Sequence, residues 1–145
     1  MLAFTLHDYF LWDDELVKYA KDKGIILIPG VEIKMREGEV LMYNIKKEYM
    51  GQLKTLADIR KLKRKDKNIF VIAPHPYYFI AQCLRKDLEK NIDVFDAIEH
   101  SWFYTQLVNC NRKAAKTARR YRLPLVANSD CHFLHFFGRT YSLVD

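Results

Sequence analysis

Histidine and carboxylate residues recur where apolar segments of this sequence end. Four of the five histidines follow such a segment closely: His7, His75, His100 and His132. Acidic residues occupy the same or neighbouring positions: Asp8, Glu32, Glu99 and Asp130. Neutral imidazole and ionised carboxylate are ligands for zinc, manganese and iron, and a bridging carboxylate can hold two ions about 3.5–4 Å apart. These residue types predict a divalent-metal site that could hydrolyse a phosphate ester.

The segment from residue 128 to residue 132 is the strongest part of this pattern. Asp130 and His132 are two residues apart, so both side chains can turn into one site. We assign both of them catalytic as well as ligand roles. We also expect a catalytic role for the cation Arg139, which would contact a substrate phosphate, and a similar contact from Lys34. His135 lies at no strand end, so we expect it on the surface or behind the ligands.

The elements that must position these residues are alternating strands and helices. Segments of strand length and composition cover residues 2–5, 25–33, 40–43, 69–73, 94–98, 125–127 and 140–144. Helical patterns cover residues 13–23, 53–65, 78–90 and 106–121. A turn signal at residues 37–39 predicts a small hairpin. The alternation is typical of a parallel α/β sheet, doubly wound or closed into a barrel, whose strands present their C-terminal ends at one functional face.

Size and composition restrict the class of protein. A chain of 145 residues is the length of one domain, so we predict a single domain over residues 1–145. Its three cysteines are widely spaced, which favours free thiols in a reducing cytoplasm over a disulfide framework or zinc ribbon. No apolar run approaches the roughly 18–20 residues of a membrane helix, and the start lacks signal-peptide features, so we expect a cytoplasmic protein without a membrane partner. The net charge of +6 favours anionic partners.

Six short motifs in this order resemble the polymerase and histidinol phosphatase (PHP) family of metal-dependent phosphoesterases. Their residues are Thr5-Leu6-His7-Asp8, Pro29-Gly30-Val31-Glu32-Ile33, Ala73-Pro74-His75-Pro76, Ala97-Ile98-Glu99-His100, Ser129-Asp130-Cys131-His132 and Gly138-Arg139-Thr140. The first resembles the family's Thr-Asp-His-Asp motif, the second its Gly-x-Glu motif, and the fifth its Ser-Asp-Ala-His motif. The resemblance covers nearly the whole chain.

The resemblance implies a distorted (β/α)7 TIM-like barrel that holds two or three divalent ions, zinc, manganese or iron, at the strand C-termini. The implied metal ligands are His7, Glu32, His75, Asp130, His132 and one of the neighbours Glu99 and His100. Glu32 would bridge two ions. Glu99 fits the motif better, whereas His100 is the better ligand type for zinc.

Three departures from the family pattern stand out. The family's His-x-His motif on a first strand has no counterpart, Leu6 replaces an aspartate, and Cys131 replaces a small residue. Because a (β/α)8 barrel takes about 250 residues, we expect an incomplete barrel that lacks its first β/α unit, a single PHP-like domain truncated at its N-terminus. Apolar surface left by a missing strand would favour oligomerisation.

The leading functional hypothesis is a metal-dependent hydrolase of a phosphorylated small molecule or nucleotide. A truncated chain could also be inactive as it stands. The alternative is a non-catalytic PHP-like barrel that acts as a nucleic-acid-binding or assembly module. The stretch from Lys46 to Lys67 favours this alternative, because it carries nine Lys or Arg against three Asp or Glu.

Overall fold

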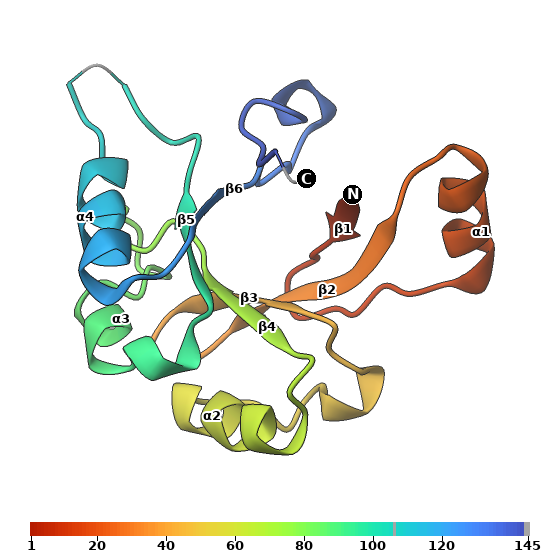
Figure 1. Cartoon of the computed structure of the whole chain (residues 1–145), viewed down its shortest axis with the longest axis horizontal. Helices are drawn as coiled ribbons and strands as arrows, with labels where there is room; N and C mark the ends of the chain where they lie inside the picture. The colour runs from red at the N-terminus through yellow and green to blue at the C-terminus, as the bar shows by residue number, and fades with distance from the viewer. Residues whose placement is uncertain (106, 144–145) are drawn as a thin grey trace.

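The computed structural model describes residues 1–105 and 107–143, within which a six-stranded sheet is flanked by four α-helices (Figure 1). The strands are β1 (Leu2–Phe4), β2 (Leu27–Lys34), β3 (Glu39–Tyr43), β4 (Phe70–Ala73), β5 (Ala97–His100) and β6 (Leu125–Ala127). The α-helices are α1 (Asp14–Asp22), α2 (Leu56–Lys65), α3 (Lys86–Lys90) and α4 (Asn111–Tyr121). Short 3-10 helices are η1 (Lys47–Tyr49), η2 (Ile92–Val94) and η3 (Leu134–Phe136).

The strands lie in the sheet in the order of the chain, β1-β2-β3-β4-β5-β6. β3 runs antiparallel to both of its neighbours, whereas the β1–β2, β4–β5 and β5–β6 pairs are parallel. The sheet curls like half of a barrel, with β1 and β6 as its two edges (Figure 1). The C-terminal ends of the parallel strands therefore surround one concave face.

The predicted (β/α)7 barrel is wrong. The described residues form only six strands and four α-helices, and β1 and β6 remain edges of an open, mixed sheet. The physical reason is the hairpin after β2: β3 returns directly from a tight turn, so no helix separates the two strands and one strand runs against the rest. The chain is an α/β protein with a half-barrel sheet.

The main hydrophobic core lies on the convex face, between the sheet and the helices. Leu56, Ile59 and Leu62 of α2 are buried there, and α4 contributes Ala114 and Ala118. The concave face has a much smaller apolar cluster, made by Leu41, Ile72 and Ala97 with Tyr43 and Val126 beside them. The concave face therefore has room for polar side chains.

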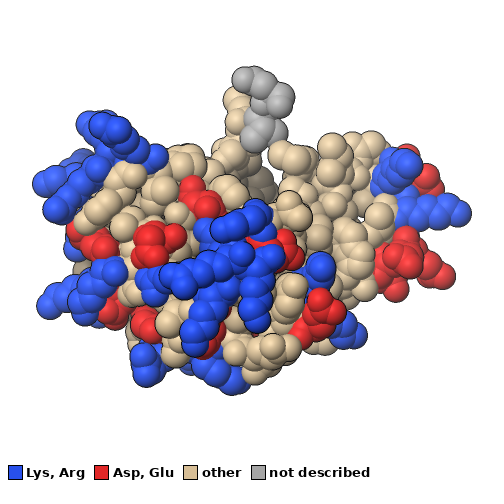
Figure 2. Space-filling view, turned by 60° about the horizontal axis from the view of Figure 1, so that its bottom comes forward, with Lys and Arg blue, Asp and Glu red and all other residues tan. Residues whose placement is uncertain are grey.

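Charged residues are unevenly spread over the surface. Figure 2 shows Lys and Arg gathered in the middle of the face that carries α2, with Asp and Glu interspersed among them. Further Lys and Arg lie at the left edge of the same view, on the side of α3 and α4. On this face of the molecule, positive charge is therefore gathered over the helices.

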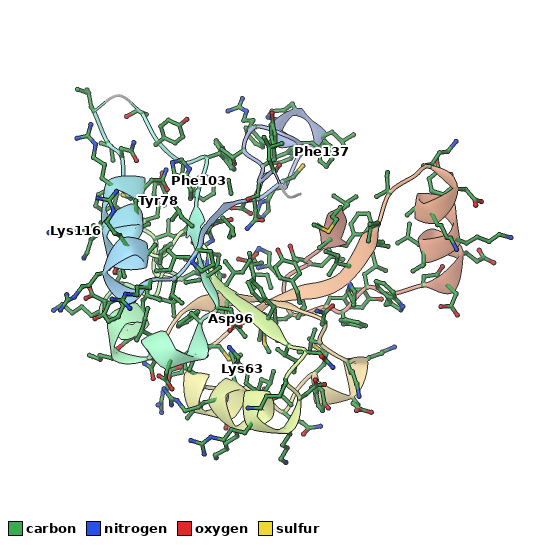
Figure 3. The ribbon with its side chains drawn as sticks, viewed as in Figure 1. Lys63, Tyr78, Asp96, Phe103, Lys116 and Phe137 are labelled. Atoms are coloured by element: carbon green, nitrogen blue, oxygen red, sulfur yellow. The ribbon has the colours of Figure 1, made fainter. Side chains whose placement is uncertain are left out.

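Ion pairs attach α2 to the segment that leads into β5. The ammonium group of Lys63 lies 2.6 Å from Asp96 and also donates to the carbonyl of Val94 at 2.8 Å (Figure 3). Arg60 pairs with Asp93 through two hydrogen bonds. Two of the five basic residues of α2 are therefore neutralised by carboxylates of the same chain.

Local predictions from the sequence hold for most of the elements. The hairpin, the strand at residues 125–127 and the helices after residues 13 and 53 are confirmed with shifts of a few residues. The helix predicted over 78–90 is wrong before residue 86, and residues 140–143 form no strand. Gln106 and residue 144, at the limits of two predicted elements, lie outside the described residues. None of the described helices has the length and apolarity needed to cross a bilayer.

Candidate metal centre

The β2–β3 hairpin brings two glutamates to the concave face. Glu32 is paired with Leu41, and Lys34 with Glu39, in the antiparallel ladder. Because residues two apart in a strand share a face, Glu39 lies diagonally beside Glu32. Both residues are buried, with Glu32 5% and Glu39 7% exposed.

The hairpin turn is held against a neighbouring loop. Gly38 adopts φ +146°, and a Cβ there would lie 2.8 Å from the carbonyl oxygen of Gln82. The next residue, Glu39, donates its backbone N–H to that same carbonyl at 2.7 Å. Only glycine fits this close approach, so Gly38 fixes the position of Glu39.

His75 enters the centre from the end of β4. Its backbone has φ +28°, an unusual conformation for a residue with a side chain. The backbone N–H donates to Glu99 Oε2 at 2.6 Å, and the thiol of Cys83 lies 3.4 Å from Nδ1. These contacts stabilise the strained backbone and direct Nε2 towards the two glutamates, an arrangement typical of functional sites.

Two imidazoles and two carboxylates face one another in a ring. The Nδ1 atom of His7 lies 3.6 Å from Glu32 Oε2 and 4.0 Å from Glu39 Oε1. The Nε2 atom of His75 lies 3.6 Å from Glu32 Oε1 and 3.9 Å from Glu39 Oε2. Each glutamate thus directs one oxygen towards each of two histidines.

Three of these residues could bind one metal ion. Ligand atoms of Glu32, Glu39 and His75 all lie within 4.8 Å of one another, and all three residues are buried. Donor atoms that share a tetrahedral ion at about 2.0–2.2 Å stand about 3.4 Å apart. The observed separations are therefore close to those of a metal site.

Two more predicted ligands, His132 and Asp130, lie next to His7. The Nε2 atoms of His7 and His132 are 3.3 Å apart. Asp130 Oδ1 lies 3.3 Å from Nδ1 of His132. The segments that follow β1 and β6 therefore meet, although the two strands do not pair.

Burial and charge shift the pKa values of several groups. Burial, followed by the charge of Glu32, raises the pKa of Glu39 and that of Asp130. Burial raises the pKa of Glu99 to about 7. For His75, burial lowers the pKa, but the contacts with Cys83 and Glu32 and the charge of Glu99 outweigh it and raise the value to about 11. These four groups therefore hold their protons to higher pH than they would in water, so the centre favours an added positive charge.

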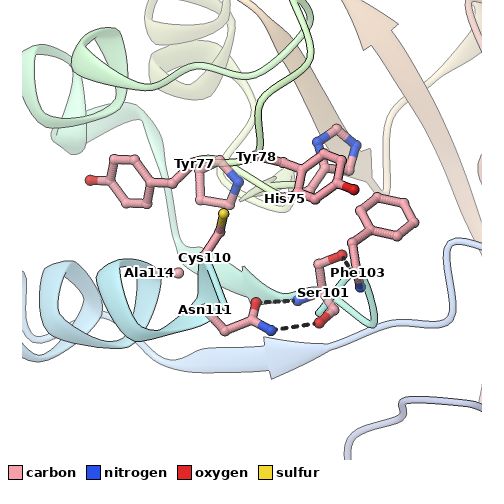
Figure 4. A pocket seen from close by; sticks show the side chains of 9 residues that line it. His75, Tyr77, Tyr78, Ser101, Phe103, Cys110, Asn111 and Ala114 are labelled. Carbon is pink, nitrogen blue, oxygen red and sulfur yellow. Dashed lines mark hydrogen bonds between the residues drawn. The ribbon is translucent and has the colours of Figure 1, made fainter. Parts of the chain in front are cut away.

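A small cavity lies behind His75 (Figure 4). Its volume is about 10 Å³, room for a single water molecule. Two hydrogen bonds between Asn111 and the backbone of Ser101, of 2.9 and 2.7 Å, close one side. A substrate would therefore have to approach from the concave face rather than from this cavity.

The remaining predicted residues are placed away from the ring of ligands. Glu99 is 1% exposed and binds the His75 N–H and Asn128 rather than facing the ring. Because neighbours in a strand point to opposite faces, His100 points away from it and packs edge-on against Tyr104. The guanidinium of Arg139 lies over the rings of Phe136 and Trp102, at 4.7 and 5.2 Å.

Sequence reasoning missed Glu39. It treated residues 37–39 only as a turn signal, although a hairpin with that turn places Glu39 on the same face as Glu32. Pairing the residues of the two strands outwards from the turn would have placed Glu39 on the face of Glu32. The contact between Cys83 and His75 has no comparable signal, because it depends on how the loop after β4 folds back.

Comparisons with known proteins add the following. The family model described as PHP-associated (PHP_C) matches residues 109–145, which include α4, β6, Asp130 and His132. The crystal structure of PsfC from Pseudomonas syringae PB-5123 has a similar fold, with a TM-score of 0.60 and 19% identity over 76% of this chain. The aligned part is 46% of that protein, so this chain spans less than half of its length. No curated protein matches the sequence. The match at residues 109–145 is consistent with a protein related to PHP-domain proteins.

Proposed function

We propose that this protein is a metal-dependent hydrolase of phosphate esters, with its metal centre at the strand ends of the half-barrel. The observation that carries the proposal is the position of Glu32, whose two oxygens face His7 and His75 at 3.6 Å each. A carboxylate between two imidazoles is the arrangement that a bridging ligand requires.

The residues present fit a divalent cation. Glu32, Glu39 and Glu99 are all buried close to His75, so carboxylates outnumber the nearby cationic group. Burying unpaired carboxylates is unfavourable, and coordination is one of the few ways to compensate it. Imidazole and carboxylate donors suit zinc, manganese and iron alike.

Each residue of the centre has a separate role in this proposal. Glu32, Glu39 and His75 hold the ion, while Glu99 fixes His75 through its backbone N–H. Asp130 contacts Nδ1 of His132 and leaves Nε2 of His132 beside Nε2 of His7, where the imidazole would act as a general acid or base. A bound divalent ion would polarise the phosphoryl group and lower the pKa of its water.

Lys34 is the cation best placed to contact the substrate. It lies opposite Glu39 in the ladder, its side chain is exposed, and its charge offsets part of the rise in the pKa of Glu39 that burial causes. A substrate phosphate above the two glutamates would be within reach of this ammonium group. The class of substrate is a phosphorylated small molecule or a nucleotide.

The test is hydrolysis of phosphomonoesters and nucleotides with added Mn²⁺ or Zn²⁺, beside metal analysis of the purified protein. We expect metal-dependent turnover that His75→Ala abolishes. His135→Ala is the matched control, because His135 is exposed in η3 and stacks on Phe133 rather than on a residue of the centre. Circular dichroism shows whether both variants fold.

Two results would overturn the proposal. Metal binding that His75→Ala leaves unchanged would refute the centre. Metal binding without turnover on any of these substrates would refute the hydrolase and leave a metal-binding module.

A further inference from the structure

The helix α4 carries a one-sided row of positive charge. Its exposed residues are Arg112, Lys113, Lys116, Arg119 and Arg120, which we call the α4 stripe. At 100° per residue these positions fall within about 120° of the helix circumference. The opposite side is buried through Asn111, Ala114, Thr117 and Ala118.

The charge of the α4 stripe is largely unopposed. Among the residues that the structure describes, Arg120 is its only member in an ion pair, at 3.2 Å from Glu89. Lys113 lies over the ring of Tyr77 at 4.2 Å and keeps its charge at the surface. Figure 3 shows Lys116 at the outer side of α4, away from the sheet.

The basic residues of α2 differ in this respect. Arg60 and Lys63 are bound to Asp93 and Asp96, and Lys61 lies 4.0 Å from Asp58. The segment from Lys46 to Lys67 has more cations than α4 in the sequence, yet several of them are neutralised within the fold. More basic side chains without an ion-pair partner among the described residues therefore lie together on α4 than on α2.

A shallow groove runs beside the stripe. It has a volume of about 290 Å³ and is lined by Glu89, Lys113, Lys116, Thr117 and Arg120. Glu89 is paired with Arg120, so Lys113 and Lys116 leave positive charge at the groove that suits a phosphate group. Arg112 and Arg120 are eight residues apart, or about 12 Å along the helix at 1.5 Å per residue.

We propose that the α4 stripe binds the phosphate backbone of a nucleic-acid strand. Phosphates follow one another every 3.4 Å of axis in one strand of a duplex, so about three to four of them match the length of the stripe. A membrane surface fits less well, because the apolar side of α4 is buried in the protein and is not available for insertion. The stripe is independent of the metal centre and of hydrolysis.

The test is binding of a short fluorescein-labelled single-stranded oligonucleotide, measured by fluorescence anisotropy in the presence of a chelator so that no hydrolysis occurs. Binding to phosphatidylserine vesicles is measured beside it. We compare the native chain with a triple variant, Arg112→Gln, Lys116→Gln and Arg119→Gln. The matched control on α2 is Lys61→Gln, Arg64→Gln and Lys65→Gln, which removes the same charge from exposed residues. All six side chains are exposed, so both variants should fold, as circular dichroism will show.

The α4 variant should lose about tenfold or more in affinity, and its plot of log K against log salt should become shallower by about two, because three phosphate contacts to a single strand are removed. The α2 variant should stay within about twofold of the native chain. Equal losses in the two variants would overturn the proposal, since they would indicate only the net charge. No binding by the native chain, or binding only to phosphatidylserine vesicles, would overturn it as well.

Discussion

The two sides of the candidate metal centre are built differently. The side chains of Glu32 and His75 are 6% and 5% exposed, whereas those of His7 and His132 are 50% and 56% exposed. On the buried side, two backbone hydrogen bonds fix the ligands. The His75 N–H donates to Glu99 at 2.6 Å, and the Glu39 N–H donates to the Gln82 carbonyl at 2.7 Å. On the exposed side, His7 and His132 follow the two edge strands of the sheet.

This difference separates two tasks. A buried, hydrogen-bonded set of ligands loses little freedom when an ion binds, so it should determine affinity. An exposed set can reach the substrate and exchange protons with water. We therefore expect substitutions on the buried side to change metal binding and stability, and those on the exposed side to have smaller effects on both.

The largest effect should follow from Glu32→Gln. This change removes the charge of the carboxylate that both imidazoles face. Metal affinity should fall by more than about 100-fold, because the loss of a supporting contact alone can reach that size. Calorimetric titration with Mn²⁺ measures it, with Glu48→Gln at an exposed position as the control. Unchanged affinity would remove Glu32 from the centre.

Glu39→Gln should have opposite effects on the metal-free and metal-bound protein. Burial and the charge of Glu32 raise the pKa of Glu39, so its charged form destabilises the metal-free fold at neutral pH. The variant should melt at a higher temperature without metal, yet bind Mn²⁺ about 10–100-fold more weakly. Thermal denaturation with and without the ion tests both parts. A lower melting temperature without metal would show that Glu39 is a structural residue.

The stability of the metal-free protein should fall as the pH rises. The pKa of Glu99 is raised from 4.5 to about 7 and that of His75 from 6.5 to about 11, so the folded protein holds protons that the unfolded chain releases. Their contribution is complete below the unfolded pKa values and is lost as the pH rises through the folded ones. Urea unfolding from about pH 5 to about pH 9 should show the decline.

Bound metal should reverse this dependence on pH. An ion replaces the protons on its ligands, so added Mn²⁺ should stabilise the protein more at the alkaline end of the same range. If the free energy of unfolding stays constant over this pH range both with and without Mn²⁺, the buried residues do not determine how many protons the folded protein binds.

The smallest effect should come from His132→Ala on the exposed side. Metal affinity should fall by less than about tenfold, and the free energy of unfolding should change by no more than about 0.5 kcal/mol, as for surface substitutions in general. The same titration and urea unfolding measure both quantities. A loss as large as that of Glu32→Gln would show that the two sides act as one rigid set of ligands.

Much of the candidate site could be predicted from the sequence. His7, His75, Asp130 and His132 were recognised because each follows a short apolar segment, and strand ends depend on such local patterns. Glu32 lies within β2 and was found through its motif and its position after Pro29 and Gly30. The hairpin was predicted from a turn signal only three residues long.

The choice that stayed open and the error in the helices both concern relations between segments that are distant in the chain. The choice between Glu99 and His100 required knowing which side of β5 faces the concave surface, and this depends on its register with β6. The helix predicted over 78–90 has suitable residues, but the loop before α3 instead braces Glu39 through Gln82 and His75 through Cys83. Tertiary contacts outweighed local preference there.

By itself, the sequence determined which residue types end the strands and therefore that imidazoles and carboxylates would meet at one face. Only the tertiary structure decided that the sheet stays open, that Glu39 joins Glu32 and His75, and that His100 points away. The reason is sequence separation. Apolar periodicity and turns depend on neighbours in the chain, whereas the closure of the sheet and the register of its strands depend on contacts between distant segments. His7 and His132, which meet at the centre, are 125 positions apart.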